Sequence, residues 1–130
     1  MKRILFAFTL ILLTASIASA QQKEASIAVV GDAVYDFGNI KEADGHVTHT
    51  FKIKNDGEAA LVVTKVVASC GCTTPEWTKE PISSGKTGEI KVTFDSTNRP
   101  GPFTKTISVY SNGKTGSFIL TIKGNVIPKN

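Results

Sequence analysis

The sequence contains few of the residues that build reactive or metal-binding sites. Its 130 residues include two cysteines, two histidines and one methionine, which is residue 1. A soft-metal site draws on Cys, Met and His ligands, and no pair of carboxylates has a spacing that suggests acid–base catalysis. We therefore expect no enzymatic activity and no bound cofactor.

The sequence also lacks a cluster of basic residues. Lys and Arg number 15 against 11 acidic residues. Lys2 and Arg3 belong to an N-terminal leader, and without them 13 basic residues remain, spread singly along the chain. Neutralising a phosphate backbone requires a basic patch or stripe. Nucleic acid is therefore not expected as a partner.

The first twenty residues have the pattern of a cleaved signal peptide. Lys2 and Arg3 precede an apolar run over residues 4–17, and Ala18-Ser19-Ala20 supplies a small-residue cleavage site. The run is shorter than the roughly 20 apolar residues of a spanning helix. We expect residues 1–20 to be a signal peptide cut before Gln21, and residues 21–130 to form one domain without membrane insertion. The predicted location is periplasmic or extracellular.

The remainder of the chain lacks sustained helical periodicity and reads as all-β. Between residues 47 and 53, Val, His, Phe and Ile alternate with Thr and Lys, and residues 88–95 alternate in the same way. Turn-forming sequences such as Asn55-Asp56-Gly57 and Ser111-Asn112-Gly113-Lys114 separate such runs. About seven short strands in a domain of this size favour an immunoglobulin-like antiparallel β-sandwich, with a small barrel as the alternative.

The alternation also predicts which side chains form the core. One face of each expected strand carries the larger apolar residues. The predicted core comprises Phe37, Phe51, Val63, Ile90, Val92, Phe94, Ile107, Val109, Phe118, Leu120 and Ile122.

The two cysteines flank a single glycine, as Cys70-Gly71-Cys72. Residues i and i+2 of an extended strand lie about 6.5 to 7 Å apart, so a disulfide here requires a bent backbone. We expect Gly71 to permit that bend through φ values that other residues avoid. Three interpretations remain open: a short-range disulfide or buried thiol pair, a thiol redox site, and a soft-metal site for copper or zinc.

Several motifs together resemble a known family. They are the run from Ser69 to Pro75, Glu80-Pro81-Ile82, the expected strand Gly88–Asp95, and Gly101-Pro102-Phe103. This combination closely resembles the bacterial domain-of-unknown-function family numbered 1573. The resemblance implies an immunoglobulin-like sandwich related to the domains of major sperm protein and of ciliary and centrosomal proteins. It also implies a secreted or envelope location, and it brings no catalytic residues.

The sequence thus predicts an exported immunoglobulin-like module with a binding or structural role in the cell envelope. The expected partner is another envelope or extracellular protein, received by backbone pairing at an edge strand or by side chains of the loops. The alternative is a thiol redox or soft-metal handling protein that uses Cys70 and Cys72. The candidate partner-binding loops span Cys70–Trp77 and Asn98–Phe103, with Pro75, Trp77, Arg99, Pro100 and Phe103 as candidate contacts.

Overall fold

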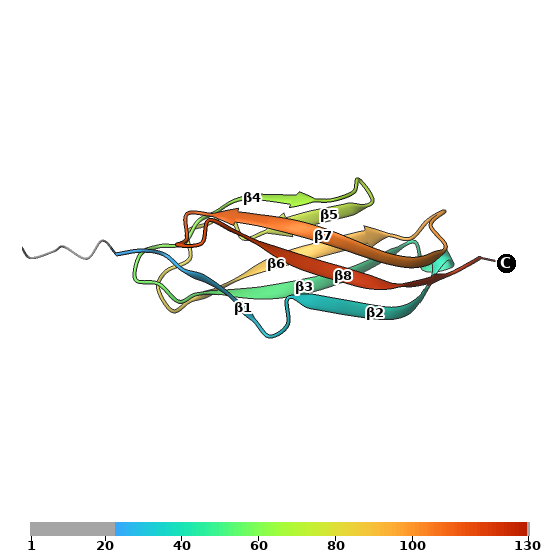
Figure 1. The fold of residues 1–130 in the computed structure, drawn as a ribbon, viewed down its shortest axis with the longest axis horizontal. Helices are drawn as coiled ribbons and strands as arrows, with labels where there is room; N and C mark the ends of the chain where they lie inside the picture. The colour runs from blue at the N-terminus through green and yellow to red at the C-terminus, as the bar shows by residue number, and fades with distance from the viewer. Residues whose placement is uncertain (1–22, 130) are drawn as a thin grey trace, which may run out of the picture.

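The computed structural model describes residues 23–129, which form a sandwich of two four-stranded sheets (Figure 1). The predicted signal peptide, with its cleavage site, lies outside the described residues. Sheet A has the strand order β1 (Ile27–Val30), β3 (His46–Asn55), β6 (Thr87–Asp95), β5 (Thr73–Trp77). Sheet B has the order β2 (Val34–Lys41), β8 (Ser117–Ile127), β7 (Gly101–Ser111), β4 (Val63–Ala68). One turn of 3-10 helix, Glu42–Asp44, joins β2 to β3.

The predicted β-sandwich is confirmed, with one pairing that the sequence did not indicate. The described part of the chain has eight strands rather than about seven, and β2 pairs with β8 in parallel, whereas the other pairs are antiparallel. A hairpin enforces antiparallel pairing, as in β7–β8, where the turn around Ser111–Lys114 lies as expected. β2 and β8 are distant in sequence, so no local turn signal specifies their relative direction.

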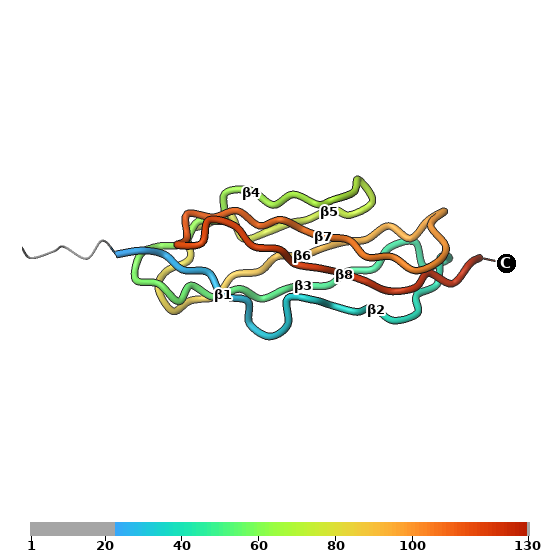
Figure 2. Tube along the Cα trace, in the orientation of Figure 1, coloured from blue at the N-terminus to red at the C-terminus, as the bar shows by residue number. Residues whose placement is uncertain are grey.

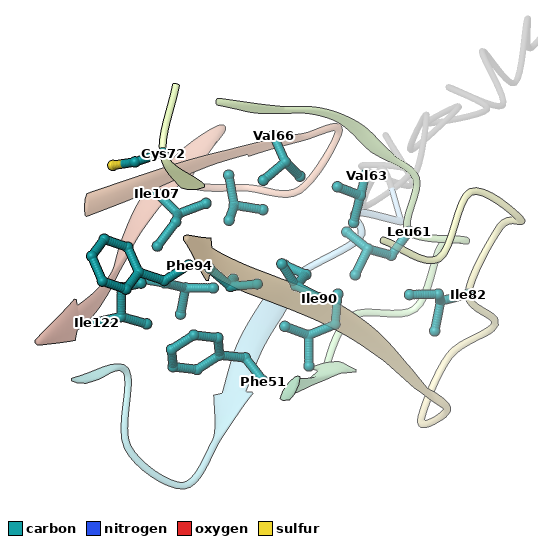
Figure 3. Close-up of a cluster of buried hydrophobic side chains, with 14 of the residues drawn as sticks. Phe51, Leu61, Val63, Val66, Cys72, Ile82, Ile90, Phe94, Ile107 and Ile122 are labelled. Carbon is teal, nitrogen blue, oxygen red and sulfur yellow. The ribbon is translucent and has the colours of Figure 1, made fainter. Parts of the chain in front are cut away.

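The core lies between the sheets, where the inward side chains of both meet (Figure 3). Nine of the eleven predicted core residues are buried, while Phe37 and Phe118 are half-buried and pack against the others. Leu61 and Ile82 also belong to the core, although both lie outside the named strands. Their backbones exchange two hydrogen bonds, of 2.9 Å from Leu61 N–H and 2.7 Å from Ile82 N–H. This bridge brings two long connections into the core.

An aromatic stack lies at the rim of the sandwich between β2 and β3. The rings of Tyr35 and His49 are parallel, with centroids 3.6 Å apart, and His49 also meets the edge of Phe51. Partial burial disfavours the charged imidazole and lowers the pKa of His49 below its ordinary value. His49 is therefore a packing residue of the rim.

Asn55 connects three segments at one end of the sandwich. The residue is fully buried, and its Nδ2 donates hydrogen bonds to the carbonyls of Ala59 at 2.7 Å and Ile82 at 2.9 Å. Its Oδ1 accepts from the N–H groups of Gly57 at 2.9 Å and Ser26 at 3.3 Å. The segment before β1, the β3–β4 connection and the β5–β6 connection are thus joined by one side-chain amide.

The Asn-Asp-Gly sequence therefore has a different structural role from the tight turn expected of it. Gly57 is not among the glycines with positive φ. A Cβ at this position would lie 2.5 Å from Ser26 N and 2.7 Å from the carbonyl carbon of Ala25. Glycine is required because the backbone before β1 passes against it.

Within residues 23–129, no helix has the length and apolar character needed to cross a membrane.

Asn55→Ala is expected to lower the free energy of unfolding by about 3 kcal/mol or more, or to prevent folding. The substitution removes the hydrogen-bond partner of three part-buried backbone groups, Ser26 N–H, Gly57 N–H and Ala59 O, while Ile82 O keeps its bond from Leu61 N–H. Each unpaired buried group costs about 1–3 kcal/mol. Asn112→Ala is the matched control, since its exposed side chain bonds Val62 N–H and Ala60 O at 2.8 and 3.0 Å. Asn112→Ala should lower the free energy of unfolding by about 1 kcal/mol. Denaturant unfolding of both variants measures the two changes. Equal losses for the two variants would contradict the role assigned to Asn55.

Candidate functional site

The two cysteines form a disulfide in the turn that carries the chain from β4 in sheet B to β5 in sheet A. Their Cα atoms are 5.2 Å apart. Cys72 is 3 % exposed and belongs to the core, while Cys70 is half-buried against it. Ser69 N–H donates to Thr106 O at 2.9 Å, and Asp95 N–H donates to Cys72 O at 2.8 Å. The turn is thus attached to both sheets.

The disulfide bears on the three interpretations of the cysteines. It leaves neither sulfur as a thiolate, which is the form that binds metals. In the part of the chain that the structure describes, no group of three or more His, Cys, Asp or Glu residues is placed to hold a metal ion. The geometry is that of a covalent link at the corner between the sheets.

Gly71 does not provide the bend in the way the sequence suggested. Its φ is outside the positive range, and a Cβ built on it meets no atom within 4 Å. The turn between the cysteines therefore tolerates a side chain. The expectation that Gly71 permits the bend through φ values that other residues avoid is wrong.

Gly71→Ala should leave the free energy of unfolding unchanged or raise it by up to about 1 kcal/mol, because alanine restricts the unfolded chain. Gly57→Ala is the opposite case. It should lower the free energy of unfolding by about 1–3 kcal/mol, because the added Cβ overlaps the backbone before β1. Thermal and denaturant unfolding of both variants, with the disulfide intact, measures the difference. A loss at Gly71 as large as that at Gly57 would contradict the open environment described.

The first candidate binding loop is largely a strand. Thr73–Trp77 forms β5, the edge of sheet A, because its alternate residues pack inward opposite Phe94, Val92 and Ile90 of β6. Trp77 is half-buried, and the ammonium of Lys79 lies 5.0 Å from its ring centroid. The expected Cys70–Trp77 loop is therefore corrected to a turn at the cysteines followed by an edge strand.

The second candidate loop is shorter than expected. Arg99 and Pro100 are exposed between β6 and β7, but β7 already begins at Gly101. Phe103 is half-buried in β7, with its ring stacked on Phe94 at 4.0 Å between centroids. The expected Asn98–Phe103 loop thus ends before Phe103, which has a packing role.

The five candidate contacts do not converge on one site. The β6–β7 loop and the cysteine turn lie at the same end of the sandwich (Figures 1 and 2). Trp77 lies at the far end of β5, opposite Ile90 rather than Phe94.

The free edge of β5 is poorly suited to backbone pairing. Asp95 N–H donates to Cys72 O, and Thr78 N–H donates to Glu89 O at 3.0 Å. The backbone N–H and C=O groups of the even-numbered residues in this segment therefore point toward β6. The odd-numbered residues direct their backbone groups outward, and among them Pro75 has no N–H. The edge lacks a donor at its centre.

The other edge strands carry different obstacles to pairing. On β2, the N–H groups of Val34 and Gly38 are taken by the side chains of Asp32 and Asp36, at 2.9 and 2.8 Å. β4 has a register shift between Val63 and Lys65, and β1 has only four residues. Proline, acidic side chains, bulges and short length are the devices that keep sheet edges from pairing. These features favour recognition by side chains over recognition by strand addition.

The outer face of sheet B collects exposed apolar side chains. Alternate residues of β8 and β7, with their partners on β2 and β4, point away from the core. Val67, Ser108 and Ile119 form one row across the sheet, and Val67 and Ile119 are 41 % and 58 % exposed. Within residues 23–129, five of the seven exposed large apolar residues lie on this sheet B face: Val34, Val67, Tyr110, Ile119 and Ile127.

The outer face of sheet A has an ordinary polar surface. β3 presents Thr48, Thr50, Lys52 and Lys54, and β6 presents alternating threonine and charged residues. A polar outer face is the usual pattern for a solvated antiparallel sheet. The contrast identifies the sheet B face as the candidate interaction surface.

The sheet B face also carries net positive charge. Lys41, Lys65 and Lys123 lie on it with one carboxylate, Asp36. The Lys65 ammonium lies 5.8 Å from the ring centroid of Tyr110. The sequence signal that could have revealed this face is the run Phe118-Ile119-Leu120, because consecutive apolar residues in a strand place one of them on the outside.

Pro75→Thr should increase self-association, because threonine restores an N–H to the free edge of β5. Light scattering after size-exclusion chromatography should give a larger mean mass than for the unmodified protein. Pro100→Thr, in the exposed β6–β7 loop, should leave the mass unchanged. If the two variants behave alike, Pro75 has no protective role.

Comparison with known proteins agrees with this architecture. The model of the family described as "Protein of unknown function (DUF1573)" matches residues 28–126. The comparison with curated proteins finds no match.

Solved structures similar to this chain share its fold. A protein of unknown function from Porphyromonas gingivalis W83 has a TM-score of 0.65 and 15% identity, with 78% of this chain and 46% of that chain covered. The human CEP192 PapD-like domain 7 has a TM-score of 0.65 and 8% identity, with 82% and 89% covered. The Vibrio cholerae VesB protease has a TM-score of 0.58 and 18% identity, with 79% and 31% covered. This chain thus spans under half of the first protein and under a third of the protease.

Proposed function

This chain belongs to the DUF1573 family of proteins of unknown function, and we propose that it is an exported, non-catalytic binding module of the cell envelope. It contacts another envelope or extracellular protein through the sheet B face. Export is supported by the signal-peptide pattern of residues 1–20. Binding by side chains is supported by the obstacles to pairing at the edge strands.

The observation that carries the proposal is the unequal character of the two outer faces. Burying an exposed Val or Ile side chain contributes about 1.5–3 kcal/mol, and the row Val67–Ser108–Ile119 offers two such residues, one on either side of the small Ser108 hydroxyl. Exposed apolar side chains do not stabilise a domain whose face stays in water, whereas they contribute free energy when a partner covers them.

Charge specifies the kind of partner. Lys65 lies beside the apolar row as the partner of Tyr110, Lys123 lies four residues beyond Ile119 on β8, and Lys41 lies opposite Ile127. The one carboxylate on this face is Asp36. Two copies of the chain placed face to face would bring like charges together, which opposes association. A partner with an apolar patch and an acidic rim satisfies both the apolar row and the lysines.

The rival role in thiol exchange or metal handling has less support. Exchange requires a thiolate to reach a sulfur of the disulfide, and Cys72 is buried in the core while Cys70 is half-buried against it. A covalent link at the sheet corner accounts for the pair without further chemistry.

The test is capture of partners from envelope extract of the source cells by the mature protein, residues 21–130. Ile119→Lys and Val67→Lys should each remove partners that the unmodified protein retains, as identified by mass spectrometry. Thr50→Lys, on the polar face of sheet A, introduces the same charge and should retain them. Circular dichroism confirms that each variant is folded. Retention by both sheet B variants, or loss only with Thr50→Lys, would contradict the proposal.

A further inference from the structure

A shallow hollow lies where the sheet B face reaches the C-terminal part of β8. Asp36, Lys123 and Thr104 form a row across β2, β8 and β7, and the amides of Asn39 and Asn125 lie beside it. The hollow has a volume of about 370 Å³, within the usual range of small-ligand sites. It is separate from the apolar row around Ile119.

Two glycines form part of the lining of the hollow. Gly38 has φ +67, and a Cβ there would meet no atom within 4 Å. Gly124 is packed closely, since its Cβ would lie 2.9 Å from Cε1 of Phe103 and 3.0 Å from Gly38 O. The absence of a side chain at Gly38 leaves its backbone open to a flat ligand, whereas the Cβ missing from Gly124 would point toward Phe103, its inward-facing partner on β7.

The polar groups of the hollow are balanced in charge and mixed in hydrogen-bonding character. One carboxylate, Asp36, is matched by one ammonium, Lys123. Asn125 Nδ2 donates to Asn39 Oδ1 at 3.3 Å, and Gly38 N–H donates to Asp36 Oδ1 at 2.8 Å. The second Asp36 oxygen and the remaining amide N–H groups are not used by these bonds, so a ligand has both donors and acceptors to bind.

We propose that this hollow binds a neutral saccharide, an activity beyond the protein-binding role proposed above. A hydroxyl group donates and accepts at once, which suits a lining of amides, carboxylate, ammonium and the Thr104 hydroxyl. The charge balance disfavours an ion as the ligand. The lining also lacks the apolar pockets that anchor peptide side chains, and the ring of Pro102 supplies a small apolar surface for a sugar ring.

The experiment is a titration of the ¹⁵N-labelled protein, residues 21–130, followed by ¹H–¹⁵N correlation spectra. The probes are chitotriose, cellotriose and maltotriose, each a neutral oligosaccharide, together with tri-glycine as a peptide of similar size. At least one sugar should produce saturable shifts concentrated at Gly38, Lys123 and Gly124. Asn125→Ala should weaken that sugar's binding at least about tenfold, as expected for a lost hydrogen-bonding group.

Thr93→Ala, on the outer face of sheet A, is the matched control and should leave binding unchanged. The proposal is overturned if none of the sugars gives a saturable shift, if Asn125→Ala binds as well as the unmodified protein, or if tri-glycine alone shifts these resonances. The Ile119→Lys variant should bind the sugar normally, so failure of the saccharide site and failure of the protein-binding face are distinguishable.

Discussion

A sandwich with four edge strands remains a separate molecule only if those edges do not pair with other chains. In this domain each edge meets that constraint differently. Pro75 removes a donor from β5, Asp32 and Asp36 occupy N–H groups of β2, β4 has a register shift, and β1 is short. The edges are therefore unsuited to binding by strand addition, which leaves the two outer faces and the exposed loops as surfaces for recognition.

The two faces differ because sheet B is apolar on both sides for part of its area. In β7 and β8 the inward residues fill the core, as the alternation requires, yet Ile119 and Tyr110 also leave apolar side chains outside. The same face ends in a polar hollow whose lining includes Gly38 and Gly124. One sheet thus carries both the apolar surface that we propose binds a protein and the polar hollow that we propose binds a saccharide, while sheet A has a polar outer face.

Local patterns in the sequence predicted the sandwich and most of its core, because strand alternation and hairpin turns depend on neighbouring residues. Long-range interactions could not be inferred in this way. Asn55-Asp56-Gly57 has the composition of a turn, but the burial of Asn55 depends on Ser26 and Ile82, which are distant in sequence. Pro75 predicted a loop, because proline is tolerated in a strand only at places such as a free edge. The position of β5 at the edge of sheet A depends on the order of the strands, which the local sequence does not reveal. The apolar outer face of sheet B was not predicted, because an exposed apolar residue in a strand resembles a core residue until its partners are known.

Site-specific photo-crosslinking in the cells of origin tests most directly whether recognition uses the sheet B face. A photoreactive phenylalanine analogue replaces Ile119 on that face, Glu76 on the edge strand β5, or Thr50 on the outer face of sheet A, and Pro75 stays in place in each variant. We expect a crosslinked protein partner at position 119 and none at positions 50 and 76. A partner captured at position 76 and absent at 119 would show that the edge strand, rather than the face, receives the partner.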